Sequence, residues 1–175
     1  LLKLPYLIAD LLILVVITKL LPASKKTLGL ILWAVNPFVL YSAYLMGQDD
    51  VIIALFFMLA IYFSSRKRGS LAAVSLGLAA GFKPFSLIML PFLTKNKWRS
   101  VLIGLTTYGL IMLPYLGSTA FKHYALLAAQ SDKPLYAKIM VSGSQYLPLF
   151  VVGLVGLWWW NMSRPKDLAQ WAWLA

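Results

Sequence analysis

The sequence has 175 residues, of which 61% are hydrophobic and 12% are charged, and its mean hydropathy is +0.80. This composition excludes an ordinary soluble domain and is typical of a membrane protein with several helices. The net charge of +11 does not indicate nucleic-acid binding, because the basic residues lie in short clusters between apolar runs. With no cysteine and a single histidine, His123, the sequence excludes disulfides and most zinc sites.

Apolar segments follow one another along the sequence. Because a helix needs about 20 apolar residues to cross the hydrocarbon layer, we expect an all-α, polytopic transmembrane bundle of roughly six to seven membrane segments. The segments are residues 4–22, 27–46, 51–64, 70–94, 99–116 and 146–162, and a seventh begins near residue 168. We expect residues 1–175 to form a single integral-membrane domain and to be a fragment truncated at both ends, since there is no initial Met and the last residues lie in an apolar run.

Four basic clusters separate the apolar segments, and the positive-inside rule places all of them on the cytoplasmic face. The N-terminus, residues 47–50 and the loop 117–145 then lie on the non-cytoplasmic face. In that loop, the stretch around His123 is predicted to form an amphipathic helix at the membrane interface. The clusters are Lys25-Lys26, Arg66-Lys67-Arg68, Lys95 with Lys97 and Arg99, and Arg164 with Lys166.

Residues 70–94 are predicted to form a re-entrant helical hairpin rather than one spanning helix. A single spanning helix would place the basic clusters before and after it on opposite faces of the membrane. A turn at Gly81-Phe82-Lys83-Pro84 avoids this conflict. Pro84 cannot continue a helical hydrogen-bond ladder, and Gly81 permits a turn.

Three charged residues are predicted to lie at one depth in the outer part of the membrane. Along a helix, Asp50 lies ~24 Å from Arg66, and Lys83 lies ~22 Å from Arg68. Asp10 is likewise ~22 Å from the cluster that begins at Lys25. Charged groups inside a hydrocarbon layer ~30 Å thick are costly unless they are paired or face water, so all three are candidates for function.

Each candidate also has a structural interpretation. Asp49 and Asp50 would equally suit the N-terminus of a helix that begins at Val51, where amides and the helix dipole favour a carboxylate. Lys83 would suit a snorkelling residue at a turn. For Asp10 we favour a structural role, as a partner of Lys83 or of a freed backbone amide. Asn36-Pro37 is predicted to break the second helix, which is architecture more than chemistry.

The order of these motifs resembles the GT-C superfamily of membrane glycosyltransferases. It is most similar to the mannosyl- and related hexosyltransferases that use polyprenyl-phosphate-linked sugars, and the resemblance covers residues 3–91. The motifs are the run from Lys3 to Asp10 (Lys-Leu-Pro-Tyr-Leu-Ile-Ala-Asp), Asn36-Pro37, Gly47-Gln48-Asp49-Asp50, Gly81-Phe82-Lys83-Pro84 and Leu90-Pro91.

The resemblance implies transfer of a hexose, with mannose as one candidate, from a polyprenyl-phosphate-linked donor to a glycan, lipid or protein acceptor. The reaction would take place at the non-cytoplasmic side of a plasma, inner or endoplasmic-reticulum membrane, within the lipid bilayer. These enzymes usually carry an acidic catalytic residue in the first outer loop, a portion that we expect to precede Leu1. The residues assigned are Asp50 and Asp49 for catalysis, and Lys83, Gln48, Asp10, Asn36 and His123 for substrate binding.

The residue types themselves agree with this chemistry. Glycosyl transfer needs a base for the proton of the acceptor hydroxyl and a positive charge for the departing phosphate. The pair Asp49-Asp50 and Lys83 supply both. The two carboxylates would also suit a divalent cation, although two ligands are too few for a closed site, so a metal cofactor is left open.

Two other classes of protein remain as alternatives. A secondary transporter or channel component would use intramembrane Asp and Lys residues and broken helices in the same way. It predicts an internal repeat, whereas the Asp-Asp and Lys-Pro elements each occur once. A non-catalytic assembly subunit predicts that Asp50 and Lys83 can be replaced by apolar residues.

Overall fold

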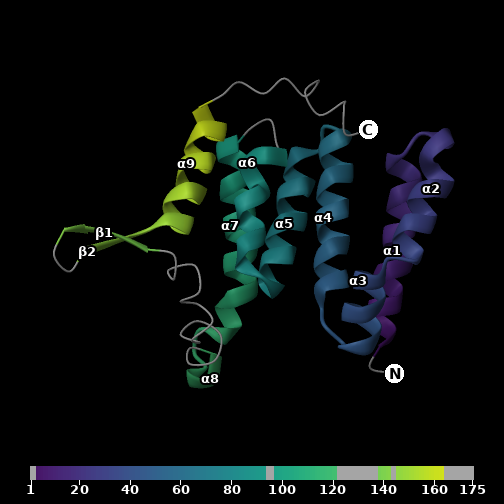
Figure 1. Cartoon of the computed structure of the whole chain (residues 1–175), viewed down its shortest axis with the longest axis horizontal. Helices are drawn as coiled ribbons and strands as arrows, with labels where there is room; N and C mark the ends of the chain where they lie inside the picture. Colours follow the sequence, from purple (N-terminus) through teal and green to yellow (C-terminus); the bar gives the residue numbers. More distant parts are fainter. Residues whose placement is uncertain (1–2, 94–96, 122–137, 143–144, 164–175) are drawn as a thin grey trace. The chain divides into compact units, whose positions relative to one another are not determined.

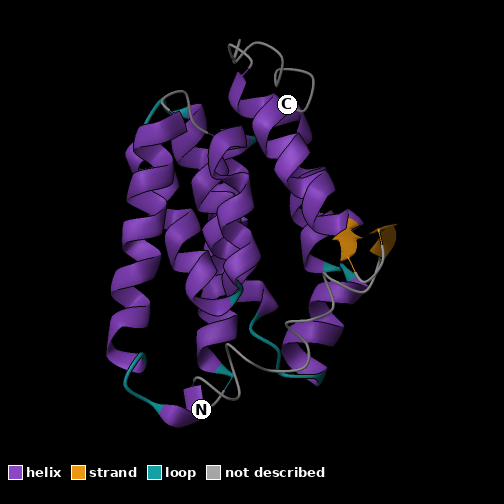
Figure 2. Ribbon diagram, turned by 90° about the vertical axis from the view of Figure 1, so that its left-hand side faces the viewer, coloured by secondary structure: helices purple, strands orange, loops and turns teal. Residues whose placement is uncertain are grey.

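The computed structural model describes residues 3–93, 97–121, 138–142 and 145–163. These residues are mostly helical, with one two-stranded hairpin drawn in orange in Figure 2. They fall into two compact units, one reaching to Tyr108 and one from Gly109 onward. The expectation of a single domain stays a prediction, and each unit is described by itself.

The first unit contains helices at the positions of the first five apolar segments. The predicted all-α class is therefore confirmed for this unit, and the observed helix ends lie close to the predicted ones. In chain order its elements are α1 (Leu4–Leu20), α2 (Ala23–Ala34), α3 (Pro37–Val39), the π-helical η1 (Leu40–Leu45), α4 (Asp50–Ser65), α5 (Gly69–Phe82), the 3-10 helix η2 (Pro84–Met89), α6 (Leu90–Leu93) and α7 (Lys97–Met112), whose last residues belong to the second unit.

The two predicted helix breaks occur at the residues that precede a proline. Asn36 has φ −64° and ψ 113°, and Lys83 has φ −138° and ψ 109°. The proline ring disfavours the α conformation in the preceding residue, so both residues adopt an extended backbone. The helix continues through Gly81 to Phe82, so the turn lies at Lys83 itself and does not use the flexibility of the glycine.

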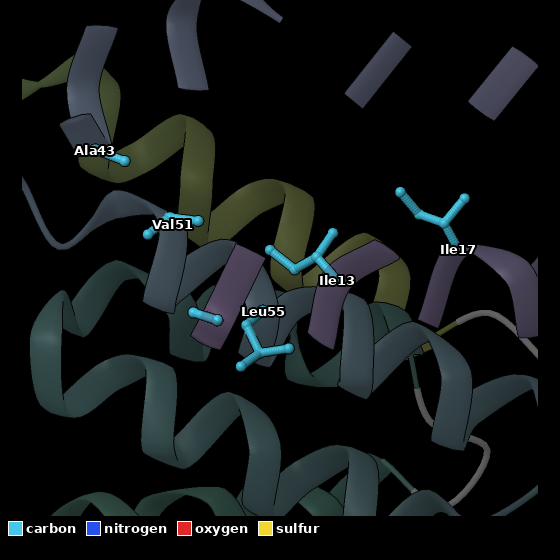
Figure 3. Packing of buried hydrophobic residues seen from close by; sticks show 6 residues of the cluster. Ile13, Ile17, Ala43, Val51 and Leu55 are labelled. Atoms are coloured by element: carbon cyan, nitrogen blue, oxygen red, sulfur yellow. The ribbon is translucent and has the colours of Figure 1, made fainter. Parts of the chain in front are cut away.

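Helices α1 and α4 pack side by side and begin at the same end of the unit (Figure 1). Their contact forms one cluster of buried apolar side chains. Figure 3 shows how the buried side chains from α1, η1 and α4 gather there. Parallel packing brings the first turns of both helices to one level, which is where the candidate site residues lie. The buried residues of this cluster are Ala9, Ile13, Ile17, Ala43, Val51 and Leu55.

The chain after α5 returns to the level at which α4 ends. The hydroxyl of Ser64, in the last turn of α4, donates a hydrogen bond to the carbonyl oxygen of Leu93, at the end of α6. Helix α5 runs away from this level and the limb formed by η2 and α6 runs back. The predicted hairpin in residues 70–94 is therefore confirmed.

Small residues allow a close approach between α5 and α7. A Cβ atom at Gly77 would lie 2.6 Å from the Cβ of Thr107 and 2.8 Å from the carbonyl oxygen of Gly104. Such distances are well inside van der Waals contact, so the position accepts only glycine without a shift of the backbone. Because Gly77 has a hydrogen atom in place of a side chain, α5 approaches the backbone of α7 at Gly104.

The second unit holds the end of α7, the short helices η3 (Leu113–Tyr115) and α8 (Thr119–Phe121), a β-hairpin and α9 (Leu149–Ser163). The antiparallel strands β1 (Lys138–Ser142) and β2 (Gln145–Pro148) were not predicted. Their β-branched and aromatic residues, such as Ile139 and Tyr146, suit a strand pair. The apolar segment 146–162 consequently becomes helical only at Leu149.

Among the described residues, one helical stretch is long and apolar enough to cross a membrane. It is Ala23–Leu45, with 23 residues and a mean hydropathy of 1.6. Because the other apolar helices are shorter, the number of six to seven membrane segments stays a prediction. The shorter helices are Asp50–Ser65, Gly69–Phe82 and Pro84–Leu93.

Candidate functional site

The first residue of α4 is Asp50, and the backbone before it is shaped by Gly47. Gly47 has φ +67°, a left-handed conformation that strains residues with a side chain. The amide of Gln48 then donates to the carbonyl oxygen of Ser42 over 2.8 Å. The carbonyl oxygen of Asp49 accepts the first helical hydrogen bonds, so α4 starts immediately after this turn.

Asp50 forms an ion pair with Lys83. The ammonium group of Lys83 donates a hydrogen bond to Oδ1 of Asp50. Lys83 lies at the break between α5 and η2, and Asp50 is the first residue of α4. The two charges therefore meet where one helix breaks and another begins. Both residues consequently lie at one level of the first unit. That this level lies in the outer part of the membrane stays a prediction.

The Asp50–Lys83 pair is open to its surroundings. The side chain of Lys83 is 41% exposed and that of Asp50 is 38% exposed. A ligand can therefore reach both charged groups. Either side chain can leave its ion-pair partner and bind the ligand without moving out of the apolar core.

Side-chain capping of α4 does not account for the two aspartates. Asp49 occupies the N-cap position, yet its side chain makes no capping hydrogen bond. The carboxylate of Asp50 is directed to Lys83 instead. The helix dipole still favours a negative charge at Asp50, because the residue lies in the first turn.

Asp10 has two aromatic partners. The indole Nε1 of Trp33 donates to Oδ1 over 2.5 Å, and the hydroxyl of Tyr44 donates to Oδ2 over 2.8 Å. The structural role favoured for Asp10 is thus present, although its partners are not Lys83 or a backbone amide. The aromatic partners come from α2 and η1.

Two further residues of α1 bind the segment that leads to α4. The ammonium group of Lys3 donates to the carbonyl oxygen of Tyr44, and the hydroxyl of Tyr6 donates to the carbonyl oxygen of Gly47 over 3.1 Å. No roles were predicted from the sequence for Tyr6, Trp33 and Tyr44. The signal for Tyr6 was its place between Lys3 and Asp10 in one motif.

The other predicted site residues have different positions. The carboxamide of Asn36 accepts a hydrogen bond of 3.0 Å from the amide of Phe38, so it caps α3. Gln48 is exposed next to Asp49. His123 lies outside the described residues. In the part of the chain that the structure describes, no three His, Cys, Asp or Glu residues form a group suited to a metal ion.

Comparison with known families gives one result. The model of glycosyltransferase family 87 matches residues 4–175, which is nearly the whole chain. Searches of curated proteins and of solved structures gave no match. The matched region includes the motif that ends at Asp10, apart from Lys3, and also the Gly47–Asp50 segment and the Lys83-Pro84 break. The chain therefore belongs to glycosyltransferase family 87, a GT-C-type family of membrane glycosyltransferases.

Proposed function

We propose that this protein transfers a hexose from a polyprenyl-phosphate-linked donor to an acceptor hydroxyl at the non-cytoplasmic face of the membrane. The family membership supports glycosyl transfer. The observation that carries the finer proposal is the accessible ion pair of Asp50 and Lys83. It combines a carboxylate, which accepts a proton, with a cation, which binds a phosphate.

The proposed reaction exchanges one glycosidic bond for another. The acceptor oxygen attacks the anomeric carbon of the sugar, and the bond between that carbon and the phosphate oxygen breaks. Asp50 takes the proton of the acceptor hydroxyl. Lys83 leaves Asp50, pairs with the donor phosphate and stabilises the negative charge of the departing polyprenyl phosphate. Asp49 and Gln48 lie next to Asp50 and are proposed to contact the sugar or the acceptor.

Two features support a lipid-linked donor over a water-soluble one. The charge pair lies at the ends of apolar helices whose exposed side chains suit a lipid environment, such as Phe82 and Phe85. A polyprenyl tail would lie in the bilayer while its phosphate reaches the level of Lys83. The basic turn Arg66-Lys67-Arg68 is at the other end of α4, so the positive-inside rule directs the charge pair to the non-cytoplasmic face.

The test uses the full-length protein in proteoliposomes that contain polyprenyl-phosphate-[14C]mannose or polyprenyl-phosphate-[14C]glucose, with membrane lipids as acceptors. We expect protein-dependent transfer of label and release of polyprenyl phosphate from one of the donors. Lys83→Met should raise the donor KM, because it keeps the apolar stem and removes the phosphate-binding charge. Lys67→Met is the matched control at the opposite end of α4, and its donor KM should equal that of the parent.

Transfer from a nucleotide sugar, with no transfer from either lipid-linked sugar, would contradict the proposed donor. Uptake of an ion or solute without any transfer would instead support the transporter alternative.

A further inference from the structure

The segment before Asp50 is held by three side chains of one helix face. Lys3, Tyr6 and Asp10 follow one another along α1 at intervals of one helical turn, so they share a face. Each bonds to the segment from Tyr44 to Gly47. Helix α1 therefore binds the segment from Tyr44 to Gly47, which is followed closely by Asp49 and Asp50.

The π-helical geometry of η1 gives Tyr44 its position. The amide of Met46 donates to the carbonyl oxygen of Tyr41, five residues earlier, over 2.9 Å. A π turn contains one residue more than an α turn and rotates the following side chains, and such turns are frequent at functional sites. In this register Ala43 is buried in the core and the Tyr44 hydroxyl reaches Asp10.

Asp10 is the centre of this contact. Its two oxygen atoms receive hydrogen bonds from Trp33 and Tyr44, so it joins α1, α2 and η1. A carboxylate with two donors is a strong acceptor, because charge-assisted hydrogen bonds exceed neutral ones in strength. Among the described residues, the same carboxylate has no hydrogen bond to Lys83, whose partner is Asp50.

We propose that Asp10 is a positioning residue, which acts through Tyr44 to fix η1 and the Gly47–Asp50 segment so that the carboxylate of Asp50 meets Lys83. This role rests on the proposed function for its effect on turnover. It does not rest on that function for its effect on the backbone of residues 47–50.

A backbone measurement tests the positioning by itself. Hydrogen exchange is followed in the full-length protein in nanodiscs, at the amide of Gln48 and its neighbours. Tyr44→Phe should raise exchange in residues 47–50 by about fivefold, because it removes a hydrogen bond from the contact. Asp10→Asn should change exchange in the same direction, because it removes the negative charge that strengthens the hydrogen bonds from Trp33 and Tyr44. Tyr41→Phe is the matched control, since Tyr41 lies in the same π-helical segment with its side chain 56% exposed. Unchanged exchange in both test variants would overturn the inference.

A mutant cycle tests whether the effect passes through Asp50. Tyr44→Phe should lower kcat with lipid-linked donor by roughly ten- to a hundredfold, the scale of a misplaced reacting group. In the Asp50→Asn background the same change should cause no further loss. A full additional loss in that background would overturn the inference, because Tyr44 and Asp10 would then act independently of Asp50. If Asp50→Asn turns over at the parental rate, the proposed function fails, and the exchange measurement alone decides the positioning role.

Discussion

At the scale of residues, the three charged groups that were predicted to share one depth, Asp10, Asp50 and Lys83, each have a partner. The level shared by Asp50 and Lys83 was predictable, because the rise of a helix is constant and both residues were counted from one basic turn. The partners of Asp10 were not predictable. Trp33 and Tyr44 come from segments whose rotation depends on a helix break and on a π turn, and the sequence contains no periodic signal for the π turn.

Ser86 provides a stability prediction at this scale. Its side chain is fully buried, and its hydroxyl has no hydrogen-bond partner among the described residues. A buried hydroxyl without a partner costs roughly 1–3 kcal/mol. We therefore expect Ser86→Ala to unfold at the same temperature as the parent or higher, in a thermal unfolding experiment in detergent.

Ser75 is the matched control for Ser86. It is also buried, but its hydroxyl donates to the carbonyl oxygen of Leu71 over 2.9 Å. Ser75→Ala should lose roughly 0.5–1.5 kcal/mol of stability, the net contribution of one hydrogen bond. A Ser86→Ala protein that is less stable than Ser75→Ala would show that the Ser86 hydroxyl has a partner, such as a buried water.

At the scale of elements, proline and glycine decide where the helices bend and meet. Both breaks were predictable from the residues before Pro37 and Pro84, since the steric rule is local. The contact of α5 with α7 was not, because Gly77 and Gly104 are far apart in sequence and their proximity depends on tertiary packing. The β-hairpin was missed for a related reason: Tyr146 begins the apolar segment 146–162, which favoured a helix, and Ile139 lies in the predicted loop 117–145.

Gly77→Ala tests the close contact between α5 and α7. The new methyl group would meet Thr107 and the backbone of Gly104 at less than 3 Å, so we expect a loss of roughly 1–3 kcal/mol from overpacking. The free energy of unfolding is to be measured in mixed micelles.

Gly109→Ala is the control for this substitution. Gly109 lies in helix α7, and a methyl group added there would have no atom within 4 Å. The alanine should therefore gain roughly 0.5–1 kcal/mol from helix propensity. Equal effects of the two alanines would refute a close approach at Gly77.

At the scale of the whole molecule, the positions of the basic clusters predict the orientation in the membrane. The hairpin was predicted because it places all basic clusters on one face of the membrane. The hydrogen bond from Ser64 to Leu93 confirms that the chain comes back to the end of α4. The number of membrane-spanning helices was less predictable. Among the described residues, only Ala23–Leu45 is long and apolar enough to cross a membrane by itself. Whether a shorter helix lies in the membrane depends on the helices packed around it. The interfacial helix predicted around His123 falls on residues outside the described part of the chain.

Cysteine labelling tests this orientation, and the sequence contains no native cysteine. Ser65→Cys and Trp98→Cys should both resist a membrane-impermeant thiol reagent applied at the non-cytoplasmic side. Ser65 precedes the hairpin and Trp98 follows it, so a hairpin that returns to its starting face leaves both residues on the cytoplasmic side. Gln48→Cys should react there. Reaction of Trp98→Cys from outside, with Ser65→Cys protected, would replace the hairpin by a spanning helix.

The paired roles of Asp50 and Lys83 are tested most directly by the turnover of Asp50→Asn in the full-length protein, with a lipid-linked sugar as donor. The asparagine keeps the size and hydrogen bonding of the side chain and removes its charge. We predict that kcat falls by about 10²-fold or more, the scale of a lost general base, while the protein remains folded and still binds donor through Lys83. Transfer by folded Asp50→Asn at the parental rate would contradict the proposed site.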